Sequence, residues 1–243
     1  GPACDCDRWL EVWNLVFIQY NRKADGMLEQ LPSKHVDTGM GFERLCMIVQ
    51  GKKSNYETDI FQPVIKEISS ITGKPYGKNE KWDIALRVIA DHIRAVAFSI
   101  ADGQIPSNNK AGYVIRRILR RAVRYGYNNL GMEEPFIHKL IPALAATMGN
   151  QYPELETGKG NIAKIIFEEE TAFLKTLGKG LKMIDRMVAD LRKDKKNTLP
   201  GKAAFELYDT FGFPVDLTRL ILKENEMELD SRGFEDEMRV QKE

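Results

Sequence analysis

The chain has little cysteine, little histidine and no long apolar run. Its three cysteines and three histidines are scattered along the sequence: Cys4, Cys6, Cys46, His35, His92 and His138. This scatter predicts neither a disulfide framework nor a four-ligand zinc site. Cys4 and Cys6 alone are a weak metal hint, and free thiols near the terminus are the alternative. No apolar run approaches the roughly 20 residues that a membrane helix needs. We therefore predict no metal site in this chain, no membrane contact and a cytoplasmic location.

Net charge is also almost absent, because 36 Lys and Arg oppose 35 Asp and Glu. Any surface for nucleic acid must therefore be local. One local excess exists, since residues 110–127 contain six basic side chains and no acid. These six residues are Lys110, Arg116, Arg117, Arg120, Arg121 and Arg124.

On a helix, Arg116, Arg120 and Arg124 form one stripe, and Arg117, Arg121 and Arg124 lie on an adjacent one. Like charges at this spacing destabilise a helix by roughly a few tenths of a kcal/mol per pair. Either nucleic-acid phosphates or acids on other helices would relieve that repulsion. Both interpretations are compatible with the sequence.

The apolar pattern changes along the chain from strand to helix. Residues 10–21 are rich in aromatic and β-branched side chains, which predicts a buried strand, and Ala24-Asp25-Gly26 predicts a hairpin turn. Apolar residues at three- and four-residue spacing then predict helices over residues 42–50, 61–71, 82–100, 111–130, 135–148 and 162–191. We expect an α+β, predominantly helical fold, with one domain over residues 1–76 and an all-helical domain over residues 77–243.

The segment from Val36 to Arg44 combines an acid, two glycines and an arginine between the predicted end of a strand and the start of a helix. Gly39 and Gly41 allow the backbone to approach a ligand closely. Arg44 offers a fork of donors for phosphate oxygens near a helix N-terminus, and Asp37 suits a cation. Taken alone, the pattern is also that of an ordinary glycine turn followed by a surface arginine.

Five motifs in a fixed order extend these observations: residues 11–17 (EVWNLVF), 37–44 (DTGMGFER), 87–94 (RVIADHIR), 112–117 (GYVIRR) and 207–214 (LYDTFGFP). Together they resemble the alanyl-tRNA synthetase family of class II aminoacyl-tRNA synthetases over nearly the whole chain. The resemblance implies the C-terminal remnant of a class II antiparallel sheet, with motif 3, followed by an all-α tRNA-recognition domain. Motifs 1 and 2 and the zinc-binding editing domain of that family are not recognised. We therefore expect an internal fragment of a larger synthetase, inactive alone.

The resemblance implies an alanine–tRNA ligase, which uses ATP with Mg²⁺ to form alanyl-adenylate and then transfers alanine to the 3′ end of tRNA(Ala). It implies that Arg44 is catalytic through the γ-phosphate of ATP, and that Asn14 and Asp37 bind alanine. The residues that it places around ATP are Val12, Trp13, Asn14, Gly41 and Arg44. Zinc is implied only for the editing domain.

The resemblance also implies two residues that read the G·U pair of the tRNA acceptor stem. These are Asn108, with which the neighbouring Asn109 could be confused, and Asp209, in a motif where Phe211 replaces a tyrosine. An amide and a carboxylate can both pair with groups in the shallow minor groove of RNA. Locally, Asn108 is also a natural helix N-cap, and Asp209 a helix-end or turn acid.

Two other classes of function stay open. One is a stand-alone acceptor-stem RNA-binding module without catalysis, against which the intact Asp37, Gly41 and Arg44 argue. The other is a helical scaffold whose arginines pair with internal acids. The scaffold predicts no salt-dependent affinity for RNA.

Overall fold

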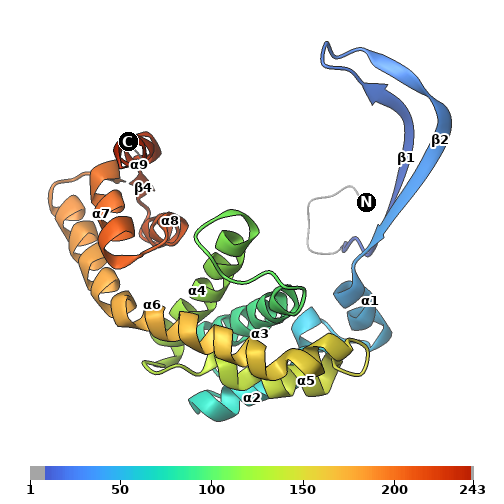
Figure 1. Ribbon diagram of the computed structural model, residues 1–243, viewed down its shortest axis with the longest axis horizontal. Coiled ribbons are helices and arrows are strands. Elements are labelled where there is room, and N and C mark those ends of the chain that lie inside the picture. The colour runs from blue at the N-terminus through green and yellow to red at the C-terminus, as the bar shows by residue number, and fades with distance from the viewer. Residues whose placement is uncertain (1–8, 242–243) are drawn as a thin grey trace. The chain divides into compact units, whose positions relative to one another are not determined.

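A computed structural model describes residues 9–241, so Cys4 and Cys6 lie outside the described residues. The chain divides into two compact units, Gly1–Gln62 and Pro63–Glu243. It is mostly helical with a small antiparallel sheet, which confirms the predicted fold class (Figure 1). The functional division at residues 76 and 77 stays a prediction.

The first unit is built around a two-stranded antiparallel ribbon, β1 (Trp13–Arg22) and β2 (Leu28–Met40). The predicted hairpin turn is confirmed, because Gly26 has φ +86° and donates its N–H to the Lys23 carbonyl at 2.9 Å. Helix α1 (Phe42–Val49) and the 3-10 helix η1 (Asn55–Glu57) follow the ribbon.

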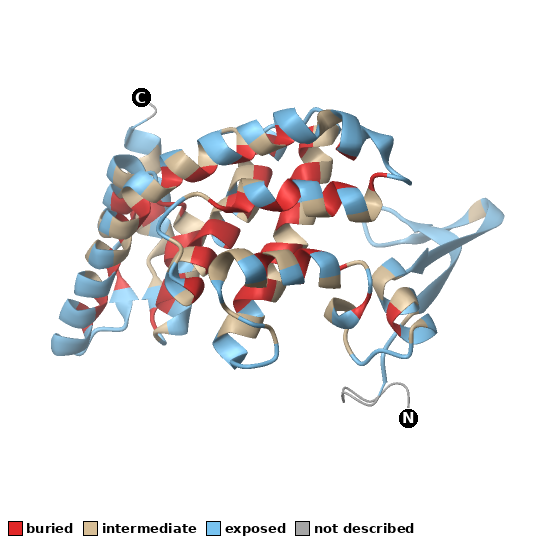
Figure 2. Cartoon of the chain, turned by 90° about the horizontal axis from the view of Figure 1, so that it is seen from below, coloured by how far each residue is buried: buried red, intermediate tan, exposed pale blue. Residues whose placement is uncertain are grey.

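The ribbon corrects two predictions. All residues of β1 are exposed, so the strand is predicted correctly but its burial is wrong (Figure 2). Aromatic and β-branched composition favours a strand, whereas burial also needs a second layer against its face. The second strand does not end at Val36 but continues to Met40, because Asp37, Thr38 and Gly39 pair with β1.

The second unit begins with helices α2 (Gln62–Thr72), α3 (Glu80–Ala101) and α4 (Lys110–Leu130). Helices α3 and α4 pack against each other, and both contact the 41-residue helix α6 (Pro153–Lys193). Fully buried apolar side chains such as Ile89, Leu119 and Ile166 fill the interfaces. Figure 2 shows buried positions along these helices in red.

Two of the predicted helices differ from the structure. The predicted helix over residues 135–148 is a 3-10 turn η2 (Ile137–Leu140) followed by α5 (Ile141–Met148), with a proline in the first turn of α5. Helix α6 begins at Pro153 rather than at residue 162, because Gly158 and Gly160 lower helix propensity without ending the helix.

Three short helices complete the second unit: α7 (Gly201–Phe211), α8 (Val215–Glu224) and α9 (Ser231–Val240). The short strand β3 (Thr198–Leu199), which precedes α7, pairs in parallel with β4 (Glu228–Leu229), which lies between α8 and α9 in the sequence. A buried apolar cluster that includes Leu191, Leu222 and Phe234 joins this part to the end of α6. Within residues 9–241, no helix is long and apolar enough to cross a membrane.

Candidate functional site

The two predicted base-reading residues, Asn108 and Asp209, line one cleft of the second unit. The cleft has a volume of about 370 Å³ and lies between the start of α4 and the end of α7. We call it the α4–α7 cleft. Its lining residues are Asn108, Asn109, Tyr113, Arg116, Arg117, Arg120, Tyr208, Asp209, Gly212, Pro214 and Gln241.

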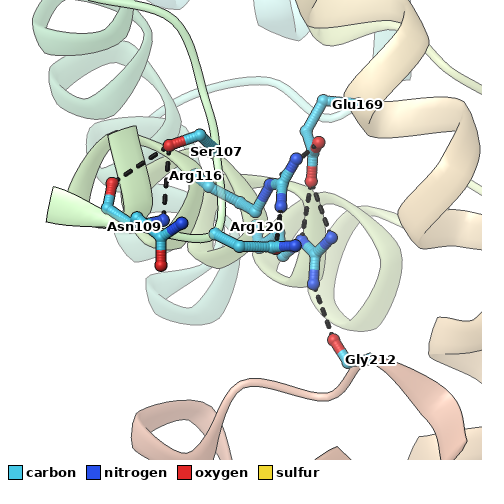
Figure 3. A network of polar contacts seen from close by, with 7 residues as sticks. Ser107, Asn109, Arg116, Arg120, Glu169 and Gly212 are labelled. Atoms are coloured by element: carbon cyan, nitrogen blue, oxygen red, sulfur yellow. Dashed lines mark hydrogen bonds and ion pairs between the residues drawn. The ribbon is translucent and has the colours of Figure 1, made fainter. Parts of the chain in front are cut away.

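The loop before α4 holds Asn108 at the edge of this cleft. Asn109, not Asn108, is the N-cap residue of α4, and its side chain makes no capping bond, so the predicted capping role of Asn108 is wrong. The Ser107 hydroxyl instead donates to the Asn109 carbonyl at 3.0 Å and accepts the Asn109 N–H at 3.4 Å (Figure 3). The Asn108 side chain does not cap the helix but lines the cleft, where its Oδ1 accepts a hydrogen bond from Arg116.

Glu169 of α6 is the shared counter-ion of two cleft arginines (Figure 3). Its Oε2 lies 3.1 Å from Nε of Arg116, and its Oε1 accepts from Nε of Arg120 at 2.8 Å. Arg120 also donates to the Gly212 carbonyl at 2.6 Å. This contact ties the turn after α7 to α4.

Other arginines of α4 are also paired with acids. Arg117 Nε lies 3.1 Å from Asp216 Oδ2. Arg124 is 7% exposed and contacts Glu224 at 2.5 Å. For four of the six basic residues, the structure therefore contains the internal acids that one interpretation of the sequence predicted.

The remaining two basic residues of the predicted surface, Lys110 and Arg121, are exposed. Neither has an ion pair among the described residues, and Arg121 lies over the ring of Tyr125 at 6.0 Å. Lys110 has φ +49°, in the left-handed region, where the loop enters α4.

The cleft presents both donors and acceptors. The guanidinium groups of Arg116 and Arg120 share one carboxylate, so they retain an excess of positive charge. On the other side, Asp209 is exposed, and its Oδ1 accepts a hydrogen bond from the Gln241 amide. Burial raises the pKa of Tyr113, as does the nearby Asp216, so its phenol is neutral near pH 7. This arrangement suits a partner that carries phosphates and hydrogen-bonding base edges.

The predicted alanine-binding residues share one face of the β1–β2 ribbon. Asn14 pairs with Gly39, and Val16 with Asp37, so side chains of Asn14 and Asp37 project from the same side. Trp13 lies on the opposite side and donates its Nε1–H to the Thr38 hydroxyl. The register therefore brings Asn14 and Asp37 together and directs Trp13 away from them.

Arg44 lies in the first turn of α1, close to the glycine motif. Its NH1 donates to the Glu11 carbonyl at 2.5 Å, and Gly41 donates its N–H to the Val12 carbonyl at 3.0 Å. A Cβ atom on Gly41 would lie 3.2 Å from Cδ of Arg44, so the glycine leaves room for this side chain. Hydrogen bonding thus brings Val12, Gly41 and Arg44 to one end of the ribbon.

Sequence reasoning missed the residues that organise the α4–α7 cleft. Glu169 is part of a Glu168-Glu169-Glu170 run on α6, and Ser107 directly precedes Asn108 and Asn109 in the loop before α4. The acidic run was the available signal, since buried arginines need carboxylates. Glu169 pairs with Arg120 and Arg116, which lie 49 and 53 residues earlier in the chain, and such pairing cannot be read from local spacing.

Comparison with known proteins identifies the family to which the chain belongs. The family model described as tRNA synthetases class II (A) matches residues 1–243. The chain belongs to this family. Proteins named alanine–tRNA ligase are similar to this class II synthetase chain: those of Bacteroides fragilis (61% identical), Christiangramia forsetii (60%) and Porphyromonas gingivalis (58%). Each match covers 96% of the chain, which spans 26–27% of the length of these relatives.

In this synthetase chain, metal ligands do not gather in the part that the structure describes. No group of three His, Cys, Asp or Glu side chains there could hold a metal ion.

Proposed function

We propose that this chain is part of an alanine–tRNA ligase, and that its second unit recognises the G·U pair of the tRNA(Ala) acceptor stem. The observation that carries the proposal is the convergence of Asn108 and Asp209 in one arginine-lined cleft. The two residues are 101 positions apart in the sequence and lie on different elements. The relatives' names and the family match supply the enzyme class.

In this proposal, the cleft holds the minor-groove side of the acceptor stem. The exposed Asp209 carboxylate accepts from the exocyclic amine of guanine, and the Asn108 amide can donate as well as accept. Arg116, Arg117 and Arg120 attract the phosphate backbone. Contacts to phosphate position the RNA, while contacts to base edges give the preference for G·U.

For the first unit, we propose that Asn14 and Asp37 bind alanine and that Arg44 binds the γ-phosphate of ATP. Of the guanidinium nitrogens of Arg44, only NH1 forms a hydrogen bond with the described residues. The other nitrogens of this group therefore suit phosphate oxygens. Val12, Trp13 and Gly41 border the nucleotide in this proposal. ATP with Mg²⁺ is a substrate that supplies the phosphoanhydride. The residues of this chain position the reactants and neutralise charge.

We further propose that the chain alone does not form alanyl-adenylate and that the whole enzyme acts in the cytoplasm. The sequence shows no counterpart of the motif 2 arginine that grips the α-phosphate in the family. Such electrostatic contacts contribute about 3–4 kcal/mol each in a transition state.

Alanine variants of the two base-reading residues test the central part of the proposal. The affinity of the chain is measured for an acceptor-stem minihelix with G·U and for the same minihelix with G·C. Asn108→Ala and Asp209→Ala are each expected to lower the G·U preference about tenfold, which is within the range for loss of one base contact. The controls are Asn161→Ala on α6 and Asp236→Ala on α9, both exposed and outside the cleft. A preference that survives both cleft variants would refute the assigned roles.

A further inference from the structure

A second basic feature, separate from the α4 arginines, runs along α6. Lys175, Lys179, Lys182 and Arg186 are all exposed and follow one another at spacings of four, three and four residues. Side chains at this spacing lie on one face of a helix. We call these four residues the α6 stripe, and it extends over roughly 16 Å.

Among residues 9–241, none of the four side chains of the α6 stripe forms an ion pair. Two other lysines of the same helix do, since Lys159 pairs with Glu156 and Lys164 with Glu168. Four of the five α4 arginines are likewise paired with acids of other helices. Four like charges at helical spacing repel one another, and an external polyanion would relieve that repulsion.

A groove accompanies the stripe. It has a volume of about 480 Å³, and Lys179, Lys182 and Arg186 line it together with Met183 and Met187. Phe211, the last residue of α7, also lines this groove, and the next residue, Gly212, lines the α4–α7 cleft. Two consecutive residues at the end of α7 therefore line the groove and the cleft, respectively.

We propose that the α6 stripe is a second RNA-binding surface, which holds the sugar–phosphate backbone of the duplex whose base pair lies in the α4–α7 cleft. The inference rests on the proposed function. Three facts favour RNA as the occupant: the positive charge without ion pairs, its extended linear form, and the consecutive residues Phe211 and Gly212 that line the groove and the cleft. A surface of this kind binds without regard to sequence, because ammonium and guanidinium groups contact phosphates alone. One acid, Asp190, borders the groove and marks where the attraction weakens.

The test compares two triple variants of the chain. The first is Lys179→Ala, Lys182→Ala and Arg186→Ala, which removes the positive side chains that line the groove. The matched control is Lys66→Ala, Lys159→Ala and Lys164→Ala, which removes the same charge from exposed positions of the same unit. The affinity of each protein for the G·U and G·C minihelices is measured over a range of salt concentrations, and melting temperatures are compared.

We expect the groove variant to bind both minihelices about 10- to 100-fold more weakly near 0.1 M salt. The slope of log K against log salt should fall by about 2 to 3, since each lost phosphate contact removes about 0.7 to 0.9. The ratio of G·U to G·C affinity should not change, and the control should bind like the wild type. A charge-preserving variant, Lys179→Arg, Lys182→Arg and Arg186→Lys, should restore both affinity and slope.

Unchanged affinity and slope in the groove variant would overturn the inference and would leave the proposed function untouched. If the wild type has no preference for G·U but still loses salt-dependent binding in the groove variant, the proposed base reading fails and the α6 stripe stands. If the wild-type chain binds a polyglutamate peptide through the stripe but binds RNA without using the stripe, the occupant of the groove is an acidic protein. That result would overturn the inference.

Discussion

At the scale of single residues, Glu169 decides how the arginines of α4 are used. Its side chain is 10% exposed, and it contacts Arg116 and Arg120 at 3.1 and 2.7 Å. One carboxylate therefore fixes two guanidinium groups and leaves one net positive charge facing the cleft. Structural and RNA-binding roles need not compete for these side chains.

Glu169→Gln should lower the free energy of unfolding by about 3 kcal/mol, because removal of one partner leaves two partly buried guanidinium groups without a counter-ion. The measurement is urea denaturation followed by circular dichroism. The control is Glu168→Gln, whose exposed side chain lies 4.0 Å from Lys164 and should change stability by less than about 0.5 kcal/mol. Equal effects of the two variants would show that Glu169 is not a structural counter-ion.

The neighbouring Glu170 performs a different task, since it binds the backbone of η2. Its carboxylate accepts the N–H groups of Phe136 and Ile137 at 3.0 to 3.2 Å and is 1% exposed. Burial raises its pKa to about 7, although these N–H bonds oppose the shift. His138, 3.7 Å away, has a pKa lowered by burial. Ionisation of Glu170 therefore costs the fold free energy near neutral pH.

The pKa of Glu170 gives a signed pH dependence. A carboxyl group whose pKa is raised on folding stabilises the folded state fully at pH values below its pKa in the unfolded chain, 4.5. This contribution is lost as the pH rises through about 7. The wild-type free energy of unfolding should fall by about 3 kcal/mol over this range relative to Glu170→Gln. Parallel pH profiles for the two proteins would contradict the assignment.

At the scale of elements, the contact between Gly112 and the preceding loop positions Asn108. The Gly112 carbonyl accepts the Ser107 N–H at 3.0 Å. A Cβ atom at residue 112 would lie 2.5 Å from the Ile105 carbonyl oxygen, which is backbone and cannot rotate away. Only glycine allows the first turn of α4 to lie this close to its own loop.

Gly112→Ala should therefore displace the loop and lower the G·U preference of the chain, together with a loss of about 1–3 kcal/mol of stability. Minihelix affinities and thermal unfolding measure the two effects. Gly160→Ala is the control, because no atom lies within 4 Å of its added Cβ and alanine favours the helix there. An unaltered G·U preference in a destabilised Gly112→Ala protein would show that the loop does not set base recognition.

The elements show what the sequence could predict. Amphipathic spacing identified α3 and α4 within one to two residues, since their buried residues recur every three to four positions. It predicted no helix after residue 193, where α7, α8 and α9 each span only 10 to 11 residues. Motif resemblance named Asn108 and Asp209, but local spacing could not show that Glu169 and Glu224 would meet the arginines. Those contacts depend on tertiary packing.

At the scale of the whole molecule, the two units differ in how they are stabilised. The second unit contains long interfaces of fully buried side chains, whereas the ribbon of the first unit leaves Trp13, Leu15 and Phe17 57 to 71% exposed. A two-stranded ribbon without a packed face is only marginally stable in water. The proposed alanine and ATP contacts lie on that ribbon and at its end.

Amide hydrogen exchange should reveal this difference. Backbone amides of β1 and β2 are expected to exchange at least about 100-fold faster than those in the middle of α3 and α4, because local opening of the ribbon exposes little apolar surface. Mass spectrometry of peptides from the labelled chain measures both regions in one sample. Comparable protection in the two regions would mean that the apolar face of the ribbon is covered.

The central claim is that the α4–α7 cleft reads a base pair and does not only attract phosphate. The most direct measurement is the ratio of affinities of the wild-type chain for the G·U and G·C minihelices at one salt concentration near 0.15 M. The account predicts a preference for G·U of about tenfold, as expected for one discriminated base pair. Equal affinities for the two minihelices would contradict it.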